Sequence, residues 1–225
     1  NVGSARIALK LGKENQKKIL KKLGLLDPVP FELMEAKITA PLNPPDWKPL
    51  TLATVSFGHS ISVSLLHLAR AYSILTNGGF DVKPTIIRKN EDQDIGKRIF
   101  KRETSDKILE LLEAVVNDER GTGRSANSVY YGIGGKTGTA DKPSKKNRGY
   151  LEERVISNFA GVFPIEEPRY VIAALLDEPE NTFKDKTCRF SGCTVVPMVK
   201  QIIERVGPLL GVIPYTIHKK NRLDS

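Results

Sequence analysis

Residues 134–140, which read Gly-Gly-Lys-Thr-Gly-Thr-Ala, hold the side chains of this sequence that are best suited to chemistry. Lys136 offers a positive charge, and Thr137 and Thr139 offer hydroxyls on either side of a glycine. A cation and hydroxyls beside bare backbone can bind an anionic, peptide-like ligand, because a carboxylate accepts charge-assisted hydrogen bonds. We expect the lysine itself, which follows two glycines, to be buried.

Two nucleotide-binding motifs have partial matches in or just before this region, but the neighbouring residues exclude both. The phosphate-binding P-loop also ends in Gly-Lys-Thr, but it needs a glycine where this chain has Tyr130 and a helix directly after the motif. Gly138 and Pro143 argue against such a helix. Residues 121–126 match a dinucleotide fingerprint, which must follow a strand, yet residues 105–116 before them have helical spacing.

A strand over residues 134–140 would give each residue a distinct task. Side chains alternate between the two faces of a strand, and a glycine leaves the edge open to another backbone. A peptide could therefore add beside Gly138 as a further strand. Lys136 and Thr137 suit a terminal carboxylate, and the backbone N–H of Thr139 is available to an oxyanion hole.

These residues and several others resemble a known family. Lys-Thr-Gly is one of the three signature motifs of the penicillin-binding proteins, beside Ser-x-x-Lys and Ser-x-Asn. Segments similar to the class B enzymes cover nearly the whole chain: 53–58, 65–72, 77–79, 121–123, 135–140, 159–164 and 177–179. Residues 47–58 are most similar to the division-specific, septal subgroup. The chain thus resembles a class B penicillin-binding protein, a peptidoglycan D,D-transpeptidase.

The resemblance implies a serine-type enzyme that crosslinks peptidoglycan stem peptides through an acyl-serine intermediate and is acylated by β-lactams. Lys136 and Thr137 would hold the substrate carboxylate, Gly138 would keep the strand edge open, and Thr139 would donate to the oxyanion. Lys136 and Thr139 would thereby take part in catalysis. The implied partners are stem peptides, β-lactam antibiotics and cell-division proteins, with no nucleic acid, no cofactor and no metal.

The chain departs from the family pattern at the residues of covalent chemistry. No Ser-x-x-Lys occurs in a credible place, because 144–147 and 105–108 both lack lysine at the fourth position. Asn1, just before Val-Gly, looks like the catalytic asparagine of Ser-x-Asn. We therefore expect the C-terminal part of a transpeptidase domain, inactive by itself, with the nucleophile upstream. The resemblance also implies the periplasmic face of the bacterial inner membrane, with an N-terminal transmembrane anchor outside this chain.

Three other functions are weighed against this one. Residues 58–62 nearly match the nucleophile elbow Gly-x-Ser-x-Gly of the triad hydrolases, but Ser62 stands where the motif needs glycine. We interpret His59 and Ser60 as turn residues and His67 as a satisfied core or groove histidine. A β-lactamase is disfavoured by the proline-rich segment 27–49. A domain without its serine could instead be a non-catalytic scaffold or binding module for division partners, and the residues upstream of Asn1 would decide between the two.

Composition sets the remaining limits. With 225 residues, 40% of them hydrophobic, the chain can form one sizeable domain. The net charge is +9, and basic residues cluster in 10–22 and 218–222. The first cluster alternates with apolar residues at helical spacing and no aromatic residues are interleaved, which favours a solvated face over nucleic-acid binding. The longest apolar run, 170–176, is too short to span a bilayer, and there is no secretory signal at the start. Cys188 and Cys193 either form a disulfide or are two small loop residues.

These residues must be positioned by an α+β fold with an antiparallel sheet packed by helices, because helical patterns segregate from a late block of strands. We expect a partial penicillin-binding/β-lactamase-like domain over 1–215 and a polar tail over 216–225. Residues 27–49 should be irregular and 141–154 a solvated loop. The expected helices are 2–11, 13–23, 62–75 with Ser62 as N-cap, 105–116 and 192–206; the expected strands are 85–88, 97–100, 134–140, 155–163 and 170–176.

Overall fold

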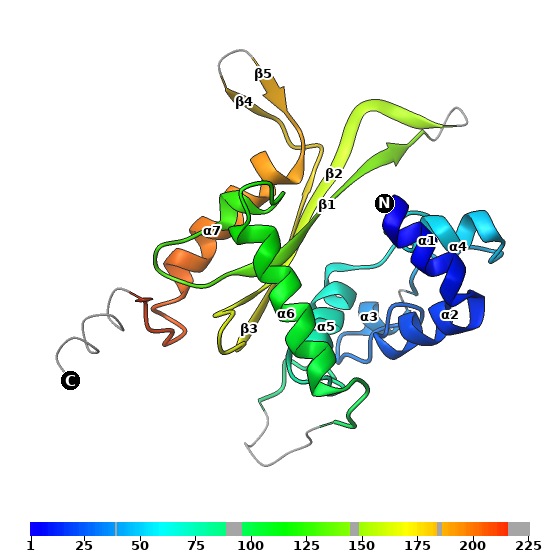
Figure 1. Cartoon of the computed structure of the whole chain (residues 1–225), viewed down its shortest axis with the longest axis horizontal. Helices are drawn as coiled ribbons and strands as arrows, with labels where there is room; N and C mark the ends of the chain where they lie inside the picture. The colour runs from blue at the N-terminus through cyan, green and yellow to red at the C-terminus, as the bar shows by residue number, and fades with distance from the viewer. Residues whose placement is uncertain (39, 89–95, 145–148, 184–185, 216–225) are drawn as a thin grey trace. The chain divides into compact units, whose positions relative to one another are not determined.

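A computed structural model describes residues 1–38, 40–88, 96–144, 149–183 and 186–215 (Figure 1). The chain forms two compact units, Asn1–Lys101 and Arg102–Ser225, a division that composition did not indicate. The expectation of one domain portion over 1–215 stays a prediction, and the expected tail, 216–225, lies outside the described residues.

The first unit is helical where the sequence pattern indicated helices. It contains α1 (Val2–Leu11), α2 (Lys13–Lys22), α3 (Met34–Ile38), α4 (Pro49–Val55) and α5 (Leu65–Thr76). Gly12 separates α1 from α2 with a φ of 83°, a conformation that glycine adopts without steric cost. The short helix α3 interrupts the segment that we expected to be irregular.

Helix α5 begins later than predicted. Its N-cap is Ser64, whereas the backbone of Ser62 forms an isolated bridge with Leu42. Ser64 is the N-cap because it forms a capping box with His67. The Ser64 hydroxyl accepts from the His67 N–H, and the His67 ring accepts from the Ser64 N–H at 3.3 Å. His67 is buried, and its other ring nitrogen lies 3.1 Å from the Asp27 carbonyl oxygen. It is therefore a satisfied core histidine, as expected.

The two short strands expected at 85–88 and 97–100 are wrong. Residues 85–88 form a bend, and only Arg98 of the second segment makes an isolated bridge, to Phe80. Glu32 explains the first failure, because its carboxylate accepts from the Thr85 hydroxyl and from the Ile86 N–H. A carboxylate thus takes the donors that a neighbouring strand would have needed.

The second unit confirms the α+β class. Its antiparallel sheet has the order β1-β2-β3, with β1 (Gly134–Pro143), β2 (Tyr150–Phe163) and β3 (Tyr170–Asp177). A separate hairpin joins β4 (Asn181–Phe183) to β5 (Lys186–Cys188). The helices are α6 (Arg102–Asn117) and α7 (Val195–Val206), with single 3-10 turns η1 (Arg124–Ala126) and η2 (Ser191–Cys193).

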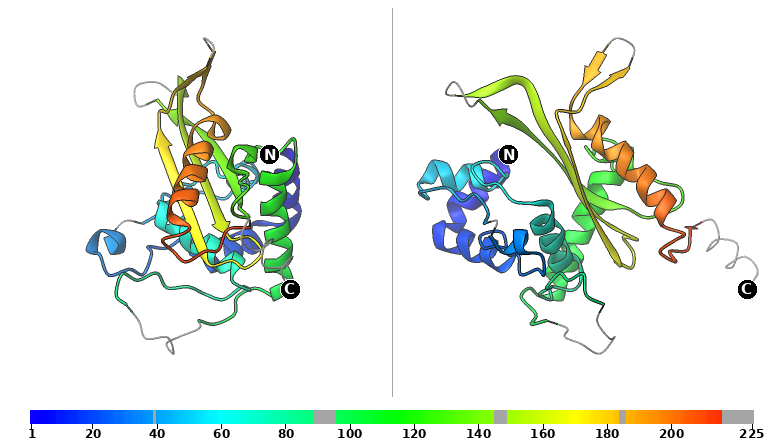
Figure 2. Two further views of the ribbon diagram at one scale, coloured as in Figure 1. Left: turned by 90° about the vertical axis from the view of Figure 1, so that its left-hand side faces the viewer. Right: turned by 180° about the vertical axis from the view of Figure 1, so that it is seen from behind.

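Helix α7 packs along the sheet, in contact with β2 and β3 (Figure 2). Phe159 of β2 and four residues of α7 are completely buried in one cluster: Val195, Val196, Val199 and Ile203. The helix begins at Val195 and not at 192, because residues 191–193 form η2. Ile202 of the same helix is 36% exposed.

The expected solvated loop at 141–154 is largely strand. Asp141–Pro143 extend β1, and residues 150–154 extend β2; residues 145–148 lie outside the described part of the chain. Ion pairs explain the longer hairpin: Lys142 pairs with Asp177 at 2.9 Å and with Glu178 at 2.8 Å, and Arg154 also pairs with Glu178. Cross-strand charge pairs of this kind let polar residues continue a ladder.

In the part of the chain that the structure describes, none of the helices combines the length and the hydrophobicity of a membrane span.

Candidate active site

The run singled out from the sequence forms β1, which lies at one edge of the three-stranded sheet. Gly138 pairs with Asn158 and Thr139 with Ser157 on β2. A strand at this position, with no helix after it, confirms that the region is not a P-loop.

Lys136 is exposed, so the expectation that it is buried is wrong. Its ammonium bends toward the next residue and donates to the Thr137 carbonyl oxygen at 3.0 Å and to the Thr137 hydroxyl at 3.3 Å. Protein around the ammonium still removes part of its water, and this desolvation lowers the pKa of Lys136. The cation is thus held beside a hydroxyl while remaining open to a ligand.

Thr122 adds a second hydroxyl to this group. Its Oγ1 lies 2.7 Å from the Thr137 Oγ1, and either atom can be the donor. The sequence offered Thr122 only as part of a rejected dinucleotide fingerprint and of a family-like segment, without a role. A threonine between two glycines was the available signal, but its partner is 15 residues away in the chain.

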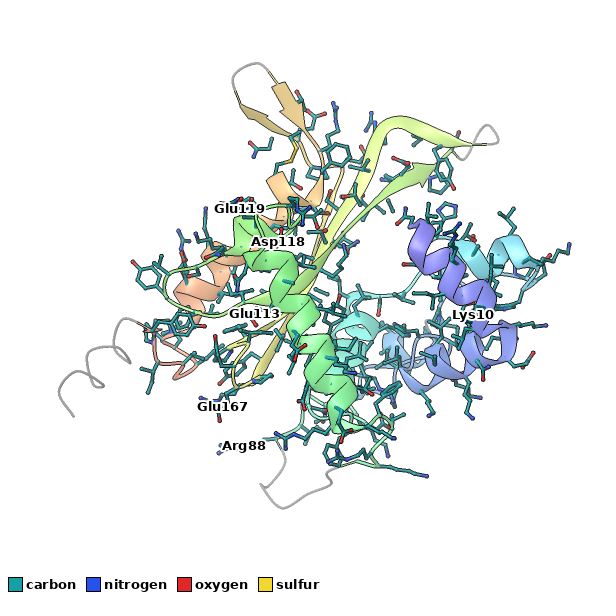
Figure 3. All side chains as sticks on the ribbon, viewed as in Figure 1. Lys10, Arg88, Glu113, Asp118, Glu119 and Glu167 are labelled. Atoms are coloured by element: carbon teal, nitrogen blue, oxygen red, sulfur yellow. A yellow bond between two sulfur atoms is a disulfide. The ribbon has the colours of Figure 1, made fainter. Side chains whose placement is uncertain are left out.

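The glycines around Thr122 bring it to this position. At Gly121 a Cβ atom would collide with the Val115 carbonyl, and the Gly123 N–H donates to the same carbonyl at 3.0 Å. The loop thereby folds back onto the end of α6. Asp118 and Glu119, labelled in Figure 3, lie at this end, and the Asp118 carboxylate accepts from the Arg120 N–H at 2.8 Å.

Gly138 leaves room for the side chain of its neighbour on β2. A Cβ atom there would lie 2.6 Å from Oδ1 and 2.8 Å from Nδ2 of Asn158, its partner on β2. The absence of a side chain therefore accommodates the Asn158 amide. The expectation that Gly138 keeps the strand edge open to a peptide ligand stays a prediction.

The Thr139 hydroxyl is engaged with the turn η2. It lies 2.9 Å from the Ser191 hydroxyl and accepts from the Ser191 N–H at 3.2 Å. No local pattern pointed to Ser191, which is 52 residues away in the chain. The expected role of the Thr139 N–H in an oxyanion hole stays a prediction.

Asn1 and Lys136 belong to different compact units, and the structure describes each unit by itself. Asn1 is exposed and precedes α1 without a side-chain capping bond. Its catalytic role stays a prediction. His59 and Ser60 lie in a turn, as expected: the His59 N–H donates to the Thr54 carbonyl, and Ser60 has a φ of 64°.

The structure resolves the choice left open for the cysteines. Cys188 and Cys193 form a disulfide. Among the described residues, no three His, Cys, Asp or Glu side chains gather as a metal site would require. At the edge strand, the Lys136 ammonium and the hydroxyls of Thr137 and Thr122 form a group suited to one carboxylate.

Comparison with known proteins assigns the family. A model of the penicillin-binding protein transpeptidase domain matches residues 1–204. The chain belongs to this family. The probable peptidoglycan D,D-transpeptidase FtsI of Caulobacter vibrioides is 36% identical over 219 residues, which are 94% of this chain and 37% of that protein.

Solved structures agree with this assignment. The transpeptidase domain of Burkholderia pseudomallei penicillin-binding protein 3 has a TM-score of 0.84 and 30% identity, and the match covers 95% of this chain and 62% of that one. Penicillin-binding protein 3 of Mycobacterium tuberculosis in complex with ampicillin has a TM-score of 0.79 and 25% identity, over 93% of this chain and 49% of that one. The class B type expected from the sequence is confirmed, and FtsI and penicillin-binding protein 3 are among the similar proteins. The chain spans little more than a third of the length of the curated FtsI relative.

Proposed function

We propose that this chain supplies the carboxylate-binding edge of a serine-type D,D-transpeptidase, and that the whole protein crosslinks peptidoglycan stem peptides. One observation carries the proposal: the Lys136 ammonium and the Thr137 hydroxyl on an edge strand form a continuous chain of contacts with the Thr122 hydroxyl from the loop after α6. The similarity to FtsI supports this function.

The reaction class follows from the family. A serine oxygen attacks the carbonyl carbon of the penultimate D-Ala, the C–N bond to the terminal D-Ala breaks, and the departing amine takes up a proton. The amine of a neighbouring stem then attacks the acyl ester, and the serine oxygen regains its proton as the C–O bond breaks. In this scheme Lys136 and Thr137 hold the terminal carboxylate, and the Thr139 N–H stabilises the oxyanion.

β-Lactams carry a carboxylate beside a reactive carbonyl and would use the same group of residues. The ampicillin complex of the similar mycobacterial protein supports this extension. We also propose that the protein works on the periplasmic side of the inner membrane. The Cys188–Cys193 disulfide supports an oxidising compartment, since cytosolic thiols are kept reduced.

Labelling of the whole gene product by a fluorescent penicillin tests the proposal. We expect covalent labelling that excess ampicillin prevents. Lys136→Met should slow labelling at least tenfold, because charge-assisted bonds to a carboxylate contribute roughly 1.5–3 kcal/mol. Lys142→Met is the matched control on the same strand, since Lys142 pairs with Asp177 and Glu178 and should leave labelling unchanged.

Two results would decide against this function. A whole gene product that is folded but never labelled would favour the alternative, a non-catalytic scaffold or binding module for division partners. Equal rates for Lys136→Met and the natural protein would remove Lys136 from the site. Residues 1–225 contain no Ser-x-x-Lys, so we further propose that this chain alone is not labelled.

A further inference from the structure

A small disulfide-closed turn lies directly behind the candidate strand. Residues 188–193, here named the cysteine turn, begin and end with the two bonded cysteines and include η2. Ser191 at its centre is only 1% exposed. A buried hydroxyl must be hydrogen-bonded to offset its desolvation, so its partners show what the turn holds.

Ser191 closes a ring of three hydrogen bonds with β1. Its hydroxyl donates to the Gly138 carbonyl oxygen, and its N–H donates to the Thr139 hydroxyl at 3.2 Å. A serine hydroxyl has one proton, which the Gly138 carbonyl already takes. The remaining contact, 2.9 Å between the two hydroxyls, therefore requires Thr139 to donate to Ser191.

This ring determines what Thr139 can offer a ligand. Its hydroxyl proton is committed to Ser191, and one of its lone pairs is occupied by the Ser191 N–H. The Thr139 side chain thus acts as a strut, and the ring fixes the peptide unit between Gly138 and Thr139 on both sides. That unit carries the N–H proposed for the oxyanion.

The cysteine turn is anchored at two further points. The hydroxyl of Ser157, the cross-strand partner of Thr139 and itself completely buried, donates to the Arg189 carbonyl oxygen at 2.7 Å. A Cβ atom at Gly192 would lie 2.8 Å from the Thr122 carbonyl oxygen, so the turn also packs closely on the loop that carries the Thr122 hydroxyl.

We propose that Ser191 is a positioning residue for acylation and that the disulfide holds it in place. The cysteine turn touches β1, β2 and the Thr122 loop, and it sets the position of the Gly138–Thr139 peptide unit relative to the Thr137 and Thr122 hydroxyls. The proposal rests on the proposed transpeptidase function. It assigns no contact between Ser191 and substrate.

Saturation kinetics of fluorescent-penicillin labelling on the whole gene product test this role. Loss of the Ser191 hydroxyl removes two buried hydrogen bonds, so Ser191→Ala should slow the first-order acylation step about tenfold. The concentration for half-saturation should change less than twofold, because Lys136 and Thr137 remain. Thr139→Val should slow the same step, and the double variant should be no slower than the slower single variant, since both changes break one ring.

Ser128→Ala is the matched control, because its hydroxyl is half-buried and donates to Glu204 at 2.6 Å, away from β1. It should be acylated at the natural rate. Cys188→Ser/Cys193→Ser should slow acylation in the same direction as Ser191→Ala, by a smaller factor. If Ser191→Ala does not fold, this disulfide variant decides: an unchanged acylation step there overturns the proposal.

The two proposals fail differently. A natural protein that is never labelled refutes the transpeptidase function and this role together. A labelled natural protein with an unchanged acylation step in folded Ser191→Ala refutes the role of Ser191 alone, as would equal slowing by Ser128→Ala.

Discussion

Two of the three glycines of β1, Gly135 and Gly138, should respond very differently to replacement by alanine. At Gly135, a Cβ atom would collide with the ring of Phe159 and lie 2.8 Å from the Ala160 carbonyl oxygen. Phe159 is completely buried, so neither neighbour can move away. At Gly138 the colliding atoms belong to the end of the Asn158 side chain, which is half-buried and can rotate.

These contacts set the expected free energies. Overpacking costs about 1–3 kcal/mol, and replacing glycine by alanine returns about 0.4–1 kcal/mol through the unfolded chain. We expect Gly135→Ala to lower the free energy of unfolding by about 2 kcal/mol, because its overpacking cost lies at the upper end of the range and the unfolded-chain term offsets part of it. Gly138→Ala should stay within about 1 kcal/mol of the natural protein, since its neighbour can yield.

Native-state hydrogen exchange of the β1 and β2 amides measures these changes locally, which suits a chain of two compact units. Gly3→Ala is a suitable control, because a Cβ atom there has no neighbour within 4 Å, and the change should not weaken the helix. Equal loss of protection in the two β1 variants would refute this reasoning, as would a greater loss in Gly138→Ala.

Acylation then separates two possible reasons for Gly138. If the glycine serves only to accommodate Asn158, then adding Asn158→Ala to Gly138→Ala should restore the natural labelling rate. If a ligand backbone approaches the strand at this point, labelling should stay slow although the strand is stable. The second outcome would support the peptide-addition mode expected from the sequence.

The remaining predictions concern three other sites. Desolvation lowers the pKa of Lys136, so this lysine loses its charge at a lower pH than a free lysine does. The rate of labelling by a carboxylate-bearing penicillin should therefore decline as the pH rises into the alkaline range. Lys136→Arg should abolish this decline, because the guanidinium stays charged. Replacing Cys188 and Cys193 by serine should destabilise the second unit by about 2 kcal/mol in urea unfolding, as expected for a short loop; no change would show that the turn needs no crosslink. Burial lowers the pKa of His67 below the value of about 6.5 that it has in the unfolded chain, so the neutral ring contributes its full stability above pH 6.5 and this contribution is lost as the pH falls below that value. The midpoint of urea unfolding should therefore drop between pH 7.5 and 5. His67→Gln, which cannot titrate, should show a smaller drop.

The candidate strand and the helices were readable from the sequence because their signals are local. Gly12 with its positive φ ends α1 as the glycine predicted, and the spacing of apolar residues located α6 within a few residues. Strand β1 followed from two glycines, a lysine and hydroxyls without helical spacing. Local signals failed where two residues competed: Ser62 and Ser64 are both good N-caps, and only the partner His67 and the bridge from Ser62 to Leu42 decided between them.

Strand formation away from the motif depended on partners that no local pattern names. Residues 85–88 have strand-forming side chains, but the Glu32 carboxylate takes their donors. Residues 141–143 and 150–154 look like solvated loop, yet ion pairs of Lys142 and Arg154 with Glu178 continue the ladder. In both cases the decisive group lies more than 20 residues away.

The family resemblance, the α+β class and the cation and hydroxyls at residues 136–139 could all be predicted before the structure, because motif and periodicity are properties of neighbouring residues. How those groups are held follows from the packing of distant segments. This packing placed the Thr122 hydroxyl on Thr137, engaged the Thr139 hydroxyl with Ser191 and made Gly138 a site for the Asn158 amide. These contacts join residues 15 to 52 positions apart, and their existence depends on packing that brings distant segments to one strand.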